Sequence, residues 1–315
     1  MSESLPQPVV LSAPTSELAE DVRALVDPAL PIEVIEWDGG EQPAPRDRID
    51  IVVPPYMKQG KALAALATVE HRLVQGQSIG YDGVQDRLPA GTVYANAASV
   101  HETATAELAV ALMLAAQREL PRMVRNQDQR AWESFETTGL ADKRVVMLGF
   151  GGVAKAVADR LLPFEVDLVP VASRARREDG IDVHGIDELS ALLPTADILV
   201  IVLPGGPETQ HLVDDAALSA LPDGALIVNV GRGPVIDTDA LVEHVSRGRL
   251  RVASDVFDPE PLPEEHPLWS LPGVIIAPHV GGRSAAMRPR IARLVASQAE
   301  RLARGEEPIN IVIRT

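Results

Sequence analysis

The sequence contains no cysteine, which excludes disulfide bonds, thiolate catalysis, cysteine-ligated zinc and iron–sulfur clusters. Aromatic residues make up only 3% of the 315 residues, so Ala, Val, Leu and Ile must build the core. Long hydrophobic runs are also missing, and runs such as 198–204 are too short to span a bilayer. The N-terminal residues lack the basic start and apolar stretch of a secretion signal. We therefore expect a cytoplasmic protein with no membrane partner.

Positive charge is scarce as well. Lys and Arg number 29 against 45 Asp and Glu, which gives a formal net charge of −16. Such a chain would be repelled at long range by nucleic acid, so we expect no nucleic-acid partner. A hydrophobic content of 46% and a charged content of 23% are typical of a folded protein, and the length suits two domains.

Short β-branched runs alternate with helical patterns along the chain, which predicts βαβ units and parallel sheets. One series of expected strands covers 8–12, 32–37, 49–53, 71–76 and 92–95, and a second covers 144–148, 167–172, 197–203, 224–229, 250–254 and 274–277. Helices are expected at 16–26, 60–69, 102–119, 153–162, 237–246 and 284–304, followed by a strand at 309–313. The helix at 102–119 is apolar on nearly every face. It is interpreted either as the connector between the two domains, which also forms part of a subunit interface, or as a core helix of one domain.

The strand at 144–148 runs into Gly149-Phe150-Gly151-Gly152-Val153-Ala154, a G-x-G-x-x-A pattern ahead of a helix. Gly149 permits the tight turn, and Gly151 lets a pyrophosphate approach the backbone. Ala154 lets the helix pack on the strand, and the unpaired N–H groups of the first helical turn attract the anion. This combination predicts a dinucleotide-binding turn.

The end of the next strand indicates which dinucleotide binds. A NAD site places an acidic residue there, but this strand ends at Ala172 and continues into Ser173, Arg174 and two further arginines. A hydroxyl and guanidinium groups suit a 2′-phosphate, so NADP(H) is the preferred cofactor, with NAD(H) as the alternative. A solvated basic loop is the competing interpretation. Pro170 removes a donor from this strand, which suggests that the strand boundary is shifted.

Three ionisable residues follow later strands, each beside glycine or proline: Arg232, Glu260 and His279. Ligands of open α/β sheets bind at the carboxyl ends of the strands, where all three are expected. They are therefore the candidate catalytic residues, and no metal is expected.

Taken together, these motifs resemble the D-isomer-specific 2-hydroxyacid dehydrogenase family over nearly the whole chain. The resemblance is carried by Ser78–Asp82, Thr105–Leu108, Gly149–Ala154, Leu203-Pro204 with Thr209, Asn229–Asp237, Asp255–Trp269 and Pro278–Gly281. The Ala-Ser-Arg ending of the cofactor strand is similar to that of NADPH-dependent glyoxylate and hydroxypyruvate reductases.

The resemblance implies a discontinuous two-domain α/β fold. A flavodoxin-like substrate domain would comprise 1–97 and 285–315, and a Rossmann domain would comprise 98–284, with the active site in the cleft. The regulatory domain of longer phosphoglycerate dehydrogenases is not expected. A homodimer is the expected assembly.

The resemblance also implies a division of roles during hydride transfer to the ketone of a 2-oxo acid. His279 would donate the proton, Glu260 would orient its ring and favour its protonated form, and Arg232 would grip the carboxylate. Backbone N–H groups around Ile79 and Gly80 would complete the substrate site.

Asp255 would hold the nicotinamide carboxamide, and Gly281 would approach the nicotinamide too closely for a side chain. The remaining residues expected at the cofactor are Thr105, Gly149, Gly151, Gly152, Val153, Ser173, Arg174, Leu203, Thr209, Val230 and Gly231.

Three residues near this set stay outside it. Arg283 replaces a residue of the family's usual His-Ile-Gly-Ser-Ala-Thr pattern, and is interpreted either as a surface charge or as a contact to a second anionic group of the substrate. His101 is interpreted as a helix-start residue. Trp269 is expected to pack where it shapes the substrate pocket.

The leading functional prediction is reduction of a small 2-oxo acid, with glyoxylate or hydroxypyruvate favoured, to the D-2-hydroxy acid. The alternatives are a nucleotide-sensing binding protein of the same fold, an NAD-dependent dehydrogenase of a D-2-hydroxy acid such as 3-phosphoglycerate, and a phosphite dehydrogenase. Formate oxidation is disfavoured because that branch of the family has a Gln–His pair, whereas this sequence has Glu260 with His279. The exact substrate and the physiological direction stay open.

Overall fold

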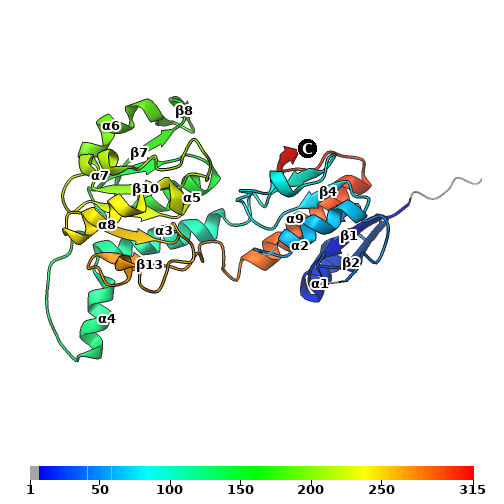
Figure 1. Cartoon of the computed structure of the whole chain (residues 1–315), viewed down its shortest axis with the longest axis horizontal. Coiled ribbons are helices and arrows are strands. Elements are labelled where there is room, and N and C mark those ends of the chain that lie inside the picture. Colours follow the sequence, from blue (N-terminus) through cyan, green and yellow to red (C-terminus); the bar gives the residue numbers. More distant parts are fainter. Residues whose placement is uncertain (1–6, 41, 58) are drawn as a thin grey trace, which may run out of the picture. The chain divides into compact units, whose positions relative to one another are not determined.

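The computed structural model describes residues 7–40, 42–57 and 59–315. The chain divides into two compact units, residues 1–101 with 284–315 and residues 102–283. The boundaries between the units lie after His101 and after Arg283, whereas the sequence predicted boundaries after residues 97 and 284. Each unit is built around its own sheet (Figure 1).

In the first unit, six strands of the described chain form a sheet in the order β14-β5-β4-β3-β1-β2. All neighbours are parallel except β14, which pairs antiparallel with β5. The strands are β1 (Val9–Ala13), β2 (Ile32–Glu36), β3 (Ile51–Val52), β4 (Leu73–Gln75), β5 (Val93–Ala95) and β14 (Ile311–Arg314). The helices are α1 (Ser16–Leu25), α2 (Gly60–Ala65) and α9 (Met287–Ala303), with short 3₁₀ helices at Leu66–Thr68 and Gln85–Arg87.

In the second unit, eight strands of the described chain follow the order β13-β12-β11-β10-β6-β7-β9-β8. Every neighbouring pair is parallel except β8 with β9. The strands are β6 (Arg144–Leu148), β7 (Asp167–Ala172), β8 (Arg176–Glu178), β9 (Ile181–Gly185), β10 (Ile198–Ile201), β11 (Leu226–Asn229), β12 (Arg251–Ser254) and β13 (Val274–Ile276). The helices are α3 (Glu102–Gln117), α4 (Leu120–Asp128), α5 (Gly152–Leu161), α6 (Leu189–Leu192), α7 (Asp215–Ala220) and α8 (Thr238–Ser246), with 3₁₀ helices at Leu162–Phe164, Ile186–Glu188, Leu193–Thr195, Gly233–Val235 and Pro267–Trp269.

The strand order of the second unit reverses between β6 and β10, which are neighbours that run to opposite halves of the sheet. β10 and β11 are buried at every position, as expected for strands covered by helices on both faces. In such doubly wound sheets, ligands bind beyond the carboxyl ends of the strands at the reversal point. The loop that follows β6 lies at this point.

Helix α3 is largely buried and packs on α5 and on β11. Its apolar character therefore serves the core of the second unit, which agrees with the alternative interpretation of the expected helix at 102–119. The helix ends at Gln117, two residues earlier than expected, because Glu119 adopts a left-handed backbone conformation with φ of 50°. After this break the chain forms α4, which the sequence did not predict.

The strand that contains Pro170 keeps its expected bounds, so the suggestion of a shifted boundary was wrong. Asp167 N–H donates to Lys143 O and Val171 O accepts from Gly149 N–H, so these residues of β7 bond towards β6. Pro170 faces the other neighbour, β9, whose pairing with β7 begins only at Val171. The missing donor therefore falls where no ladder bond is needed.

Candidate active site

The loop after β6 has the geometry of a phosphate-binding turn. Gly149 has φ of +103°, and a Cβ on it would lie 2.8 Å from Val202 O, so both the conformation and the packing require glycine. Gly151 is the N-cap of α5 and supplies no side chain to the first helical turn. Among the described residues, no heavy atom beyond its chain neighbours lies within 4 Å of where its Cβ would be. A helix start with open space before it and no capping side chain fits a pyrophosphate.

The segment after β7 divides its arginines between different contacts. Arg177 donates to Asp182 across the β8–β9 hairpin at 3.1 Å. Arg176 donates to Glu178 Oε2 at 2.7 Å and to Phe150 O at 3.3 Å. Ser173 and Arg174 are exposed after the end of β7. The competing interpretation as a solvated basic loop therefore applies only in part, because the segment continues into a short hairpin and Arg176 contacts the phosphate-binding turn.

Arg232 follows β11 and is fixed through its backbone. Asn229 Nδ2 donates to Arg232 O at 2.9 Å, and Asn229 Oδ1 accepts from Gly231 N–H at 3.0 Å. A Cβ on Gly233 would lie 1.9 Å from Phe257 O, so this loop packs directly on the loop that follows β12. The loop of Arg232 and the chain leading to Glu260 are therefore held against each other.

His279 follows β13, and its Nδ1 is hydrogen bonded to the Glu260 carboxylate. An ionised carboxylate only accepts, so Nδ1 carries the proton and Nε2 is left for exchange with a substrate. The His279 side chain is 34% exposed, and therefore reachable. The structure brings Glu260 and His279 together as the sequence predicted for a positioned general acid.

Asp255 holds the backbone on which His279 sits. Its Oδ1 accepts from Val280 N–H at 2.7 Å and its Oδ2 from Gly281 N–H at 2.8 Å, while its carbonyl accepts from His279 N–H at 2.9 Å. Burial raises the pKa of this carboxyl, and the two backbone N–H groups oppose that rise. The sequence did not predict this anchoring, and the contact to a carboxamide stays a prediction.

The other residues predicted at the cofactor lie on neighbouring loops of the same unit. A Cβ on Gly231 would lie 2.6 Å from Leu203 O, so the loops after β10 and β11 touch. A Cβ on Gly281 would lie 3.4 Å from Thr105 Cγ2. Further positions are Gly152 and Val153 in the first turn of α5, Val230 after β11, and Thr209, whose hydroxyl donates to Pro204 O at 2.8 Å.

Ile79 and Gly80 belong to the first unit, in the loop after β4, where Ile79 O accepts from Asn96 Nδ2 at 2.8 Å. His101 belongs to the same unit and is buried. Its ring stacks on Tyr56 with centroids 5.7 Å apart, and its Nε2 lies 2.6 Å from Gln77 O. These contacts make His101 a packed residue of the first unit directly before α3, and its exclusion from the site stays a prediction.

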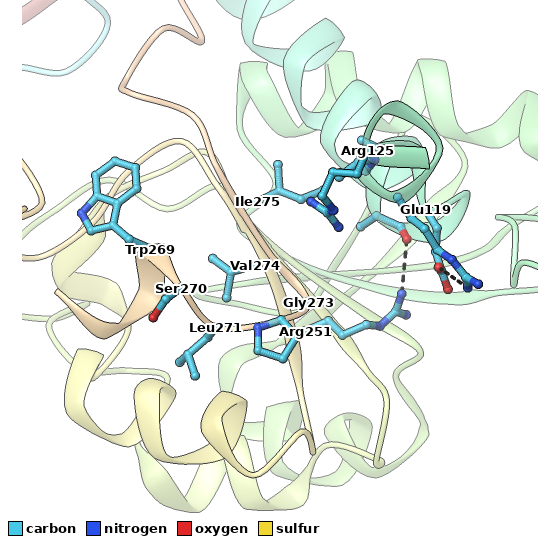
Figure 2. A pocket seen from close by; sticks show the side chains of 14 residues that line it. Glu119, Arg125, Arg251, Trp269, Ser270, Leu271, Gly273, Val274 and Ile275 are labelled. Atoms are coloured by element: carbon cyan, nitrogen blue, oxygen red, sulfur yellow. Dashed lines mark hydrogen bonds and ion pairs between the residues drawn. The ribbon is translucent and has the colours of Figure 1, made fainter. Parts of the chain in front are cut away.

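A pocket of about 520 Å³ lies elsewhere on the second unit (Figure 2). Trp269, Ser270 and Leu271 lie on one side of it, and Glu119 and Arg125 lie on the other. None of the predicted site residues lines it. Trp269 is 52% exposed and lines this pocket, and the expectation that it helps to shape the substrate pocket stays a prediction. Its Nε1 donates to Pro263 O, which fixes the indole away from the core.

Comparisons with known proteins agree with this geometry. Residues 110–281 match the family described as D-isomer specific 2-hydroxyacid dehydrogenase, NAD binding domain. A glyoxylate reductase from Thermofilum pendens is 32% identical over 252 residues, covering 76% of this chain and 74% of the relative. The chain belongs to the D-isomer specific 2-hydroxyacid dehydrogenase family. Membership confirms the predicted family and makes the protein an NAD(P)-dependent oxidoreductase of 2-hydroxy acids.

Solved structures of the family share the fold. A D-isomer specific 2-hydroxyacid dehydrogenase family protein from Aeromonas salmonicida superposes with a TM-score of 0.84 at 25% identity, covering 99% of this chain and 100% of that one. An NADPH-dependent glyoxylate/hydroxypyruvate reductase from Sinorhizobium meliloti, in complex with NADP and malonate, gives 0.77 at 26% identity, covering 99% and 98%. The predicted two-domain α/β fold class is therefore confirmed.

In the described part of the chain, no helix has the length and apolar character that a membrane span needs. Within the same residues, no group of three or more His, Asp or Glu side chains lies together as a metal site would require.

Proposed function

We propose that this dehydrogenase uses NADPH to reduce a small 2-oxo acid, with glyoxylate or hydroxypyruvate favoured, to the D-2-hydroxy acid. The observation that carries the proposal is the Glu260–His279 pair, which follows β12 and β13 beside the loop that holds Arg232. The names of the similar reductases from Thermofilum pendens and Sinorhizobium meliloti support this substrate class.

Each residue of the pair has a distinct task in the proposed reaction. A reduced nicotinamide supplies the hydride when it is bound, and negative charge then develops on the substrate oxygen. His279 Nε2 protonates that oxygen while Nδ1 stays bonded to Glu260, which fixes the ring and stabilises the imidazolium. Arg232 pairs with the substrate carboxylate through its fork of donors. Ile79 and Gly80 supply backbone N–H groups to the same carboxylate.

The residues around the phosphate-binding turn fit a dinucleotide, because Gly151 faces open space at the start of α5. The preference for NADPH over NADH is supported by Ala172, because no carboxylate there would repel a 2′-phosphate. The exposed Ser173 and Arg174 beside it also support the preference. An NAD-dependent reaction on 3-phosphoglycerate, phosphite oxidation and nucleotide sensing are the alternatives that the tests must separate.

The first test follows oxidation of NADPH and NADH in parallel, with glyoxylate, hydroxypyruvate and larger 2-oxo acids as substrates. Faster turnover with NADPH on the two small acids is expected. Faster turnover with NADH would contradict the cofactor assignment, and NADPH binding without turnover on any acid would favour the sensing role. Arg174→Asp is expected to shift the preference towards NADH, because a carboxylate repels the 2′-phosphate.

The second test separates chemistry from binding. His279→Gln is expected to lower kcat by about 10²- to 10⁴-fold, the usual contribution of a positioned general acid. NADPH affinity, measured by fluorescence titration, should stay unchanged. Full activity of this variant would exclude His279 as the proton donor.

We also propose that the protein forms a homodimer through α4 and residues 129–138. No residue of α4 is buried, it extends away from the sheet of its unit (Figure 1), and Trp132 after it is fully exposed. Glu133, which follows Trp132, already pairs with Arg122 of the same chain at 3.5 Å, so Trp132 is the side chain left for a second copy. Tryptophan is a residue type that subunit interfaces favour, and burial of this indole in a dimer would remove a large apolar side chain from water.

Light scattering of the purified protein tests this assembly. A dimer is expected, and Trp132→Ser should raise the monomer fraction. Phe164→Ser is the matched control, because it removes another exposed aromatic side chain from the same unit, outside the proposed interface, and it should leave the dimer intact. A monomeric wild-type protein would overturn the homodimer.

A cytoplasmic location stays a prediction.

A further inference from the structure

Arg176, the first residue of β8, links three segments around the predicted cofactor site. Its Nη2 donates to Phe150 O in the phosphate-binding turn at 3.3 Å, and its Nη1 lies 3.5 Å from Arg174 O after the end of β7. Its Nε donates to Glu178 Oε2 at 2.7 Å. The guanidinium is therefore pinned between the turn that would hold the pyrophosphate and the strand end that would meet the adenosine ribose.

The two neighbouring arginines lack this placement. Arg177 points to the other side of β8, where it pairs with Asp182, and its side chain is 70% exposed. Arg174 is exposed after the end of β7, in a stretch without regular structure. A flexible arginine loses more side-chain entropy on binding a phosphate than one that is already held.

Glu178 is held in turn from the phosphate-binding helix. Lys155, in the first turn of α5, bonds to Glu178 Oε1 at 2.6 Å and to Asp179 Oδ2 at 3.1 Å. The bond to Lys155 lowers the pKa of Glu178, with Arg176 adding to the effect, and the bond to Glu178 raises the pKa of Lys155. Glu178 therefore stays ionised, and its charge is offset by two cations rather than directed at a ligand.

We infer that Arg176 is a second recognition residue for the 2′-phosphate of NADP(H), and that Glu178, held by Lys155, positions its guanidinium for that contact. This inference rests on the proposed preference for NADPH and adds residues to Ser173 and Arg174. When the 2′-phosphate binds, it takes the Nη groups of Arg176, while Nε stays on Glu178. A guanidinium fork can serve both partners because its donors point in different directions.

Calorimetric titration of the full chain with NADP⁺ and with NAD⁺ tests the role of Arg176 without relying on turnover. Arg176→Gln is expected to raise the Kd for NADP⁺ about tenfold, as loss of a charge-assisted bond to phosphate would. The Kd for NAD⁺ should change less than about twofold. Arg177→Gln is the matched control, since it removes an equal charge from the opposite side of β8, and it should leave the ratio of the two Kd values within about twofold of wild type.

A double-mutant cycle tests the positioning role of Glu178. Glu178→Gln alone is expected to raise the Kd for NADP⁺ about threefold, because the guanidinium is released. In the Arg176→Gln background the same change should have no effect, since Glu178 acts only through Arg176. Arg176→Lys, which keeps the charge but not the fork, should give an intermediate Kd and covers the case that Arg176→Gln fails to fold.

The wild-type ratio separates this inference from the cofactor proposal. If wild type prefers NADP⁺ and Arg176→Gln keeps that preference, Arg176 has no recognition role and only the inference fails. Equal weakening of both cofactors by Arg176→Gln would also overturn it, by showing that the arginine merely supports Phe150. If wild type binds NAD⁺ at least as tightly as NADP⁺, the cofactor proposal fails and the inference fails with it.

Discussion

Replacement of Gly281 by alanine distinguishes two physical reasons for a glycine at this position. The family resemblance explains it by close approach of the nicotinamide. The structure adds a reason within the protein itself, because a Cβ on Gly281 would lie 2.8 Å from Asp255 Oδ2. That oxygen accepts the Gly281 N–H at 2.8 Å, and the other carboxylate oxygen is held by Val280 N–H. The carboxylate therefore has to move and break at least one of these bonds.

The cost follows from the burial of Asp255, which is 3% exposed. Loss of one hydrogen bond to a buried carboxylate is worth about 1.5–3 kcal/mol. For a unit the size of residues 102–283, that corresponds to a fall in Tm of about 3–12 °C. The fall is expected in the absence of any cofactor, because the contact lies within the protein.

Scanning calorimetry of the cofactor-free protein measures this effect. Gly60→Ala at the start of α2 is a suitable control, because among the described residues its Cβ would have only Arg87 Nη1 nearby, at 3.6 Å. Its Tm should stay within about 1 °C of wild type or rise slightly, since alanine favours helix. If Gly281→Ala also melts like wild type but binds NADPH poorly, packing on Asp255 is refuted and nicotinamide approach alone explains the glycine.

Two further predictions concern other titratable groups. Glu260→Gln is expected to lower kcat about 10- to 100-fold with little change in NADPH affinity, because His279 loses its charged partner. Steady-state kinetics and a cofactor titration measure the two effects, and an unchanged kcat would contradict the prediction. Burial raises the pKa of Tyr94 from 10.0 to about 12, so the stability it contributes is present below pH 10 and lost as pH rises through 12. Tyr94→Phe should therefore reduce the fall of Tm above pH 10. In the wild type, tyrosinate absorbance should show one of the three tyrosines losing its proton only near pH 12. If the variant shows the same fall of Tm as the wild type, Tyr94 is not its cause.

The strands and the phosphate-binding turn could be predicted because their residues are selected by local rules. β10 and β11 read as continuous apolar runs, since parallel strands are covered on both faces. The bounds of β6 and β7 are those expected, because a glycine turn and a charged start delimit them. The shorter strands of the first unit, such as β3, were overestimated, although Val53 N–H still donates to Ser12 O and Ile49 N–H to Glu70 O beyond the two paired residues.

Two elements escaped prediction for the opposite reason. Helix α4 buries none of its residues, so it has no core-facing stripe by which the sequence could identify it. The β8–β9 hairpin has a mostly exposed, charged first strand, and only its Asp179-Gly180 turn and the alternation in β9 signalled it. The contacts of Arg176 depend on this hairpin, which is why the arginines after β7 could not be told apart from the sequence.

The glycines of the site differ in what lies beside them. Each glycine predicts that another group lies close to the backbone there, but the sequence motif does not tell whether that group is a ligand or another segment of the protein. Gly149, Gly231, Gly233 and Gly281 each abut a neighbouring segment of the protein at less than 3 Å from a would-be Cβ. Gly151 alone among these five faces open space. Four of them therefore serve to bring the loops at the carboxyl edge of the sheet into contact, and that contact is what sets Arg232, Glu260 and His279 on rigid backbone. Only Gly151 has the geometry expected of a glycine kept small for a ligand.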